Sequence, residues 1–549
     1  MKKLTFNNQS ITFRLISEST NLVVLGWIAT FLITLSIYLF LAGLLVTSFD
    51  FNDETEKLIT VKLIASGLRL YKDIFVQHGP TSYMLSHIFY KIYPSHSLAP
   101  YRLIPIALSL LATISLVISP LFSKKRTGLI AGILFLFGLS AFQVYYAFVM
   151  TMYQVYGGYF YTISLALFII PFVFGIDLKP WHAWIAGISL SMMFFSSFSF
   201  LLTIFFSIVF CLLGFLFNPK NKNRLNPVIH FIGGGLVGIG VVALWMFLYS
   251  DFIGYFIYHI FFNIKFYGYY IAFKASSLSS PFLLINPYEL NKLRINFKEP
   301  FSIFFLRLSA FSTIMLFGLT FFKLKIFGSQ NYLYVLAITI LICMAIFTNS
   351  RLSLDFGEST YVLTFFTLIA LLTGLIIEKR NILPSSVVTI LQVTITLFVL
   401  SGILVQFDKT ILYGTSIKKY YTHKAELGPL DSEEMRYLRS LVTENEKIMQ
   451  IPFNLNFYIW ADRLPISGIF YWMPWMNDYA KANPFNGYSL NLCEQLNSDP
   501  PKAIYYDGTG IWGNSPESFM LCILDLLQKN YSRSSKSINI WFRNDVITH

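Results

Sequence analysis

Acidic and imidazole side chains gather shortly after the first long apolar segment of this chain. Asp50, Asp53 and Glu54 follow that segment directly. Asp73 and His78 come later in the same polar stretch. Carboxylates beside lipid are costly to desolvate, so a group of them is a candidate functional site. This first polar stretch is therefore the leading candidate in the sequence.

Two chemical uses suit adjacent carboxylates such as Asp53 and Glu54. A carboxylate near a hydrophobic wall can accept a proton from a hydroxyl as a general base. Two neighbouring carboxylates can also hold a divalent cation. The alternative is that both are solvated charges at the membrane surface with no specific role. The nearby Asp73, Gln77 and His78 favour a functional role, but they do not distinguish a base from a cation site.

Three arginines near the ends of apolar segments are candidates for binding a phosphate. Arg102 stands at the start of one segment, and Arg307 lies several residues inside a later one. Arg351 shares a short loop with Asp355 and Glu358, with which it could instead form a local ion pair. Arginine suits the bidentate recognition of phosphate, including that of a lipid. The alternative for Arg102 is that its side chain extends to the membrane surface.

The composition identifies the class of protein that must position these groups. Hydrophobic residues make up 55% of the chain and charged residues 13%, whereas ordinary soluble domains have about 45–50% and about 25%. Apolar runs of about 18 or more residues predict a polytopic helical membrane protein. The net charge of +13 comes from short basic clusters between these runs. Because the clusters form no single patch, we exclude nucleic acid as a partner.

The apolar runs predict about eleven membrane spans. Basic clusters fall at alternate ends of these spans, and the positive-inside rule makes those ends cytoplasmic. We therefore predict a multi-pass protein of the plasma (inner) membrane with a cytoplasmic N-terminus, and an odd number of spans puts residues 408–549 outside. The predicted spans are 22–47, 100–122, 127–148, 156–176, 181–197, 199–217, 227–249, 300–322, 332–348, 359–377 and 385–407.

The remaining segments divide the chain into a membrane module, 1–407, and an outer soluble region, 408–549. Within the first outer loop, 48–99, Leu58 and Val61 recur at helical spacing beside Glu56 and Lys57. This pattern is typical of an amphipathic helix lying on the membrane, and a second short helix is predicted over 82–93.

The soluble region, 408–549, alternates amphipathic helical patterns with short strand-like runs. This alternation predicts a small α/β domain. The region contains Cys493 and Cys522. An oxidising compartment would permit a disulfide between them, but the sequence leaves the pairing open because it does not reveal the geometry.

Several of these residues occur in an order that resembles a known family of membrane enzymes. The family is that of GT-C fold glycosyltransferases that use a polyprenyl-phosphate sugar, such as protein O-mannosyltransferases and the lipid A aminoarabinose transferase. In the outer domain, Tyr458–Pro465 and Pro500–Asp507 also resemble the family's signatures. The motifs of the first hundred residues are, in chain order, Asp53-Glu54, Gly67-Leu-Arg-Leu-Tyr71-Lys-Asp73, Gly79-Pro80-Thr-Ser-Tyr83 and Arg102.

The resemblance implies an inverting sugar transfer at the outer face of the membrane, to a lipid, glycan or protein acceptor. Asp53 would take the proton of the acceptor hydroxyl, with Glu54 in support. No cofactor is implied with certainty, and a divalent cation stays open. The other implied roles are binding of the donor phosphate by Arg102, His78, Arg307 and Arg351, and binding of substrate by Asp73, Tyr71 and Tyr83.

Two other functions fit a basic, aromatic-rich polytopic protein. One is a flippase or transporter of lipid-linked sugars, and the other is a polymerase or ligase of surface polysaccharide. A flippase needs polar groups on a path between both leaflets, often with repeated halves. Here the candidate groups collect on the outer side and no repeat is visible. This favours an enzyme at one face, while the polymerase or ligase stays open.

The one-sided basic clusters give a testable topology. Reporter fusions placed after Lys125 and after Asp408 are expected to report opposite sides of the membrane, since an odd number of spans separates the N-terminus from 408–549. Paired fluorescent and alkaline phosphatase reporters at each site measure this. Finding both fusion points on the same side would contradict the predicted topology.

Overall fold

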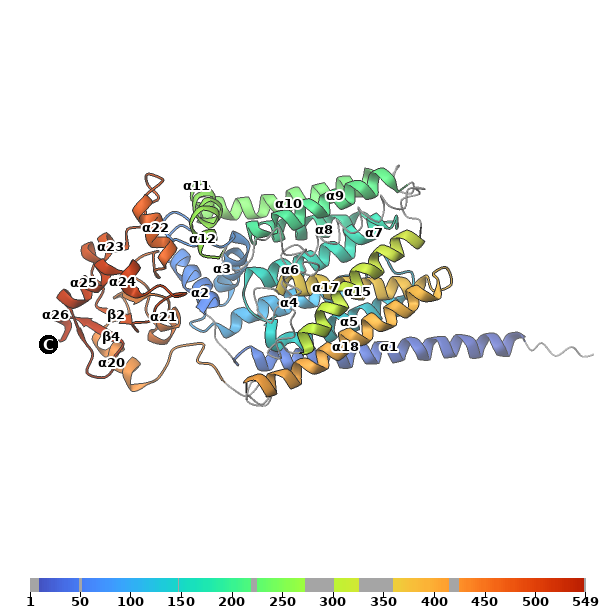
Figure 1. Ribbon diagram of the computed structural model, residues 1–549, viewed down its shortest axis with the longest axis horizontal. Coiled ribbons are helices and arrows are strands. Elements are labelled where there is room, and N and C mark those ends of the chain that lie inside the picture. The colour runs from blue at the N-terminus through green and yellow to red at the C-terminus, as the bar shows by residue number, and fades with distance from the viewer. Residues whose placement is uncertain are drawn as a thin grey trace, which may run out of the picture.

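The computed structural model describes residues 9–48, 52–146, 148–218, 225–271, 301–324, 359–413 and 424–547. Figure 1 shows an elongated molecule in which long helices run side by side and a smaller C-terminal domain lies at one end. Two short helices, α2 (Asn52–Ala65) and α3 (Pro80–Ile92), lie between the long helices and that domain.

The described ranges contain nine helical segments that are long and apolar enough to cross a membrane. They make the chain a polytopic helical membrane protein, as predicted. The segments are Leu22–Leu45, Ala99–Val117, Lys125–Gln143, Tyr153–Val173, Phe198–Leu216, Leu225–Tyr249, Phe304–Lys323, Thr360–Glu378 and Ser385–Phe407. The helices that form them are α1 (Gln9–Leu45), η1 (Ala99–Arg102), α4 (Leu103–Val117), α5 (Lys125–Tyr146), α6 (Tyr153–Ser164), η2 (Leu165–Ile169), α7 (Ile170–Val173), η3 (Phe198–Phe200), α9 (Leu201–Phe217), α10 (Leu225–Tyr249), α15 (Phe301–Lys323), α17 (Ser359–Glu378) and α18 (Ser385–Tyr413).

Two of the predicted spans are not among these nine segments. The predicted span 181–197 is observed as α8 (Pro180–Phe194), which has 15 residues and rises about 22 Å. This is shorter than the hydrocarbon core of a bilayer, about 30 Å, although α8 packs against α10 and runs beside it in Figure 1. The predicted span 332–348 lies outside the described residues.

The core of the membrane module is formed by its most buried helices. The spans Tyr153–Val173 and Thr360–Glu378 are almost wholly buried, whereas α1 and α10 expose many aliphatic side chains. In a bilayer, exposed leucine and isoleucine side chains face lipid. A π-helical segment, η2, interrupts the first of these spans just before Pro171. Proline has no N–H to donate to the preceding turn, which is a common cause of such irregularities.

The helix α2 is present where the sequence predicts a helix, but it is buried in the protein. All of its residues from Glu54 to Val61 are buried, and the helix contacts α3 and the C-terminal domain. The structure therefore places α2 inside the protein, between the membrane helices and that domain, and not on the membrane surface. Gly67, with φ of +99°, follows the end of this helix in a conformation that glycine adopts at little cost.

A second segment lies near the same end of the long helices, beside the C-terminal domain (Figure 1). It comprises α11 (Phe252–Gly254), η4 (Tyr255–Phe261), η5 (Asn263–Tyr267) and α12 (Gly268–Ile271), of which η4 and η5 are π-helical. Its Tyr255, Tyr258 and Phe262 are buried, whereas Ile253 and Phe256 are exposed. The segment therefore packs one face against the protein and presents an apolar face outward.

The C-terminal domain is a small α/β unit, as predicted. Its four strands are ordered β1-β2-β4-β3 in one sheet. The pair β1 and β2 is parallel, with Ile448 opposite Ala503, and the other pairs are antiparallel. The elements are α20 (Glu433–Leu441), β1 (Ile448–Ile451), α21 (Asn456–Ala461), α22 (Pro474–Ala482), α23 (Leu492–Ser498), β2 (Ala503–Tyr506), α24 (Pro516–Phe519), α25 (Leu521–Asn530), β3 (Tyr531–Arg533), β4 (Ile540–Arg543) and α26 (Asn544–Ile547).

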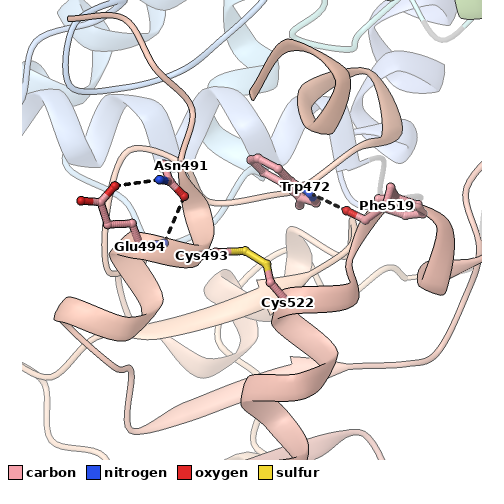
Figure 2. The surroundings of a disulfide bond; sticks show 6 residues. All are labelled: Trp472, Asn491, Cys493, Glu494, Phe519 and Cys522. Atoms are coloured by element: carbon pink, nitrogen blue, oxygen red, sulfur yellow. Dashed lines mark hydrogen bonds between the residues drawn. A yellow bond between two sulfur atoms is a disulfide. The ribbon is translucent and has the colours of Figure 1, made fainter. Parts of the chain in front are cut away.

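A disulfide joins Cys493 of α23 to Cys522 of α25 (Figure 2). Figure 2 also shows Trp472 beside it, whose indole N–H donates to the carbonyl of Phe519 at 3.0 Å. The pairing that the sequence leaves open is therefore present in the structure.

The disulfide predicts how many thiols the denatured protein exposes. Without reductant, the denatured protein should take up two maleimide groups, on Cys211 and Cys343. After reduction it should take up four, and mass spectrometry counts them. The bond closes a loop with a sequence separation of 29, so replacing Cys493 and Cys522 with serine should cost about 3–4 kcal/mol of unfolding free energy. Cys211→Ser is the control. Four maleimides without reductant would contradict the pairing.

Candidate functional site

The helix α2 separates its acidic side chains onto different faces. Asp53, Glu56 and Lys57 have the spacing i, i+3 and i+4, which places them on one face of a helix. Glu54 follows Asp53 directly and so points in another direction. The N-terminal part of α2 is attached to the C-terminal domain, because Thr55 donates its hydroxyl to Asn456 Oδ1 at 2.6 Å. The two faces of α2 therefore have different environments.

The Glu54 face holds a buried ion pair with Arg102. Arg102 Nη2 donates to Glu54 Oε2 at 2.5 Å, and its Nε donates to Glu54 Oε1 at 3.2 Å. Arg102 Nη1 also donates to the carbonyls of Leu45, the last residue of α1, and of Val46. The Glu54 carboxylate accepts the N–H of Thr151 at 2.7 Å. Both charged side chains are inaccessible to solvent, so these bonds secure α2 to the ends of the membrane helices.

The other face of α2 carries a second buried cluster around Glu56. Glu56 Oε2 accepts from Lys57 Nζ at 2.8 Å, and Glu56 Oε1 accepts from the Tyr83 hydroxyl at 2.8 Å. His78 Nε2 lies 3.4 Å from Glu56 Oε2. The Lys57 ammonium lies 5.1 Å from the centre of the Tyr83 ring. The Glu56 carboxylate thus lies beside a cation, an imidazole and a phenol.

The loop that carries His78 is fixed on several sides. The Tyr71 hydroxyl donates to the His78 carbonyl at 2.6 Å, and the Asn263 amide donates to the Gln77 carbonyl at 2.7 Å. His259 Nδ1 lies 2.9 Å from the same Gln77 carbonyl, and its Nε2 accepts the N–H of Phe198 at 3.0 Å. These partners require His259 to be neutral with its proton on Nδ1.

The His78 loop packs so closely against the backbone of Phe195 and Ser196 that its last residue, Gly79, has no room for a side chain. A Cβ at this position would lie 2.3 Å from the carbonyl oxygen of Phe195. Pro80 then occupies the first turn of α3, where its missing N–H has no cost. The Gly-Pro pair of the sequence motif therefore brings the loop against the α8–η3 connection and starts α3.

Burial sets the charge state of the imidazoles in this region. Burial lowers the pKa of His78 well below its usual range, and the neighbouring Lys57 cation and His259 lower it further. Burial likewise lowers the pKa of His259 to about 4. Both imidazoles are therefore neutral at neutral pH. A neutral His78 ring has one nitrogen that can donate a hydrogen bond and one that can accept a hydrogen bond.

Asp53 lies at the partly open end of the Glu56 cluster. Its side chain is half-buried. Burial raises the pKa of the Tyr267 and Tyr471 phenols, and the negative charges of Asp53 and Glu56 raise both further. Both carboxylates therefore lie near these two phenols, one from η5 and one from the C-terminal domain. Asp53 thus lies where the membrane module and the C-terminal domain meet.

The other residues named from the sequence have different surroundings. Tyr83 contacts Glu56, as described above. Tyr71 is buried and supports the His78 loop, whereas Asp73 is exposed and its Oδ2 accepts the N–H of Arg69 at 2.8 Å. Asp73 therefore shapes a turn at the surface. Arg307 is half-buried near the start of the span that α15 forms, and Arg351 lies outside the described residues.

Sequence reasoning missed the roles of Glu56, Lys57, Tyr267 and Tyr471. It assigned the first two to the polar face of a surface helix. Their spacing from Asp53 was a usable signal, because positions i, i+3 and i+4 share a face. No local pattern marks Tyr267 or Tyr471, because each is brought to α2 by tertiary packing. Within the described residues, no three His, Cys, Asp or Glu side chains are grouped so as to hold a metal ion.

Comparison with known proteins gives matches among solved structures alone. No protein-family model and no curated protein matches this chain. One match is a structure of the oligosaccharyltransferase AglB from Archaeoglobus fulgidus in complex with an inhibitory peptide and a dolichol-phosphate. Its sequence is 14% identical to this chain, and the TM-score is 0.37. The match covers 86% of this chain and 69% of that chain. ArnT from Cupriavidus metallidurans bound to undecaprenyl phosphate is 11% identical with a TM-score of 0.44, covering 80% and 85%. A second Archaeoglobus fulgidus oligosaccharyltransferase structure, tethered with an acceptor peptide, is 12% identical with a TM-score of 0.37, covering 93% and 74%.

The Glu54–Arg102 pair predicts a loss of stability when one partner is removed. Arg102→Met leaves a buried carboxylate without its cation, which should cost about 3–5 kcal/mol of unfolding free energy. Adding Glu54→Gln should recover part of this loss. Thermal unfolding of the purified protein measures both. Wild-type stability in Arg102→Met, combined with weaker binding of the donor lipid, would instead support the role of Arg102 in binding phosphate.

Proposed function

We propose that this chain is a membrane glycosyltransferase that moves a sugar from a polyprenyl phosphate to a hydroxyl acceptor. The observation that carries the proposal is the pair of carboxylates, Asp53 and Glu56, on one face of a helix held between the membrane helices and the C-terminal domain. A lipid-linked donor in the bilayer and a water-soluble or surface-bound acceptor can both reach such a boundary. The ordered motifs from Asp53 to Arg102 support the same function.

We assign the role of general base to Asp53. Glu56 is buried, whereas Asp53 is half-buried, so Asp53 is the more accessible carboxylate of this face. Asp53 lies in the first turn of α2, where the helix dipole favours the charged form. In this role Asp53 takes the proton of the acceptor hydroxyl. The hydroxyl oxygen of the acceptor forms the new bond to the anomeric carbon. Glu54, paired with Arg102, supports the base by fixing α2.

The leaving polyprenyl phosphate carries negative charge that must be stabilised. Of the proposed phosphate ligands, His78 is the one that lies beside Glu56. Lys57 adds a buried cation in the same cluster, and we include it among the groups that meet the phosphate. Arg307, near the start of the span that α15 forms, and Arg351 remain proposed ligands. Tyr83 supports the cluster from α3, and Tyr71 supports the His78 loop. The bond from the anomeric carbon to the phosphate oxygen breaks as the acceptor attacks, so the configuration inverts.

The proposed location is the outer face of the plasma membrane, with the N-terminus in the cytoplasm. The disulfide between Cys493 and Cys522 favours an oxidising compartment for the C-terminal domain. The basic clusters between spans favour the same orientation. Both carboxylates of the cluster would then act outside the cell, where no nucleotide-sugar pool is present and a lipid-linked donor is the natural source of sugar.

The function predicts a large loss of transfer when the base is neutralised. Asp53→Asn should lower transfer by about 10²–10⁴-fold, the usual contribution of a general base, while the protein still inserts and folds. The assay follows radiolabelled sugar from mannosyl, glucosyl or aminoarabinosyl polyprenyl phosphate onto an acceptor. Asp525→Asn is the matched control, since Asp525 is an exposed carboxylate of α25 in the C-terminal domain. Activity of Asp53→Asn within about twofold of wild type would refute the assignment, and EDTA sensitivity would reveal a metal.

A further inference from the structure

An exposed tryptophan stands on a glycine-rich loop of the C-terminal domain. The loop between β2 and α24 reads Asp507-Gly-Thr-Gly-Ile-Trp-Gly-Asn514, and the side chain of Trp512 is 59% exposed. Large apolar side chains are costly to leave in water, and a single exposed one is common. The surroundings of Trp512 distinguish it from such ordinary cases.

The loop holds Trp512 in a backbone conformation that bulky residues rarely adopt. Trp512 has φ of +48°, and Gly513 follows it with φ of +84°. Ile511 and Asn514 exchange backbone hydrogen bonds of 3.0 and 2.9 Å across this tight turn. The Asp507 carboxylate accepts the N–H and hydroxyl of Thr509 at 2.9 and 2.7 Å. A left-handed conformation at a non-glycine residue is strained, and such strain is concentrated at functional sites.

The Trp512 ring belongs to a cluster of aromatic rings with Trp475 and Tyr267. Its centre lies 4.9 Å from that of the buried Trp475 and 6.2 Å from that of Tyr267. Tyr267 and Trp475 lie 5.0 Å apart. Tyr267 is one of the two phenols near Asp53 and Glu56. The exposed Trp512 ring therefore contacts Tyr267, and the charges of Asp53 and Glu56 act on the Tyr267 phenol.

We propose that Trp512 is a stacking platform for a sugar ring of the acceptor. This inference rests on the proposed transferase function and names the chemical class of its acceptor as a saccharide. An indole face suits the apolar face of a sugar ring, and nearby polar side chains such as Thr509 and Asn514 suit its hydroxyl groups. The platform belongs to the soluble domain, so it would receive the acceptor from the aqueous side while the donor lipid stays in the bilayer.

The binding test uses the full-length Asp53→Asn protein in nanodiscs, so that no turnover occurs. The probes are methyl glycosides of mannose, glucose, galactose, N-acetylglucosamine and glucuronic acid, and saturation-transfer NMR measures their affinity. At least one glycoside is expected to bind. Trp512→Gly should weaken that binding by about tenfold, because glycine accepts the positive φ and loses only the ring. Trp512→Tyr should restore most of the affinity.

Two controls separate the platform from general effects of the substitutions. Trp181→Ala removes another exposed tryptophan, at the start of α8, and should bind the glycosides like its parent. Thermal unfolding checks that Trp512→Gly is folded. In the active protein, Trp512→Gly should raise the acceptor KM about tenfold and leave the donor KM unchanged.

Several results would overturn the proposal. They are no binding of any glycoside, equal binding by Trp512→Gly and its parent, and binding of peptide acceptors alone. The outcome is distinct from that of the transferase proposal, because glycoside binding is measured without transfer. If the wild-type protein transfers no sugar, Trp512-dependent binding would keep the platform and refute the transferase. Transfer by the wild-type protein without Trp512-dependent binding would do the reverse.

Discussion

The buried ion pair between Glu54 and Arg102 is the constraint on which the arrangement of the site depends. It joins α2 to the end of α1, the start of α4 and the segment before α6 in one set of bonds. A buried charge without its partner is strongly unfavourable, so α2 has little freedom to rotate or shift. Because the helix is fixed through Glu54, its other face holds Asp53 and Glu56 where the membrane helices and the C-terminal domain meet.

The loop and short helices next to α2 are held by both parts of the protein. The loop from Leu70 to His78 is bonded to the end of α10 through Tyr249 and to the C-terminal domain through Gly468. The π-helical segment from Tyr255 holds the Gln77 carbonyl from the side. The proposed site therefore belongs to neither the membrane module nor the soluble domain alone, which is the arrangement expected when one substrate lies in lipid and the other in water.

The sequence predicted the class of fold and placed the candidate site in the segment that contains α2, but it did not predict the partners of each residue. Long apolar runs report membrane helices reliably, because span length follows from bilayer thickness; the short α8 lies in a run broken by serines. Helix α2 has apolar and charged residues in a surface-like pattern, yet it is buried because Glu54, Glu56 and Lys57 find partners inside the protein. The partners of these buried charged side chains include residues distant in the chain, such as Arg102 and Thr151. A local sequence pattern therefore could not reveal that α2 is buried.

The most direct test of the account follows the fate of the sugar itself. The purified protein is reconstituted in liposomes with a radiolabelled polyprenyl-phosphate sugar, and candidate acceptors are supplied on the side of the C-terminal domain. The account predicts that the label becomes covalently attached to an acceptor on that side, with release of polyprenyl phosphate. Label that crosses the bilayer while still attached to its lipid would contradict the account and indicate a flippase.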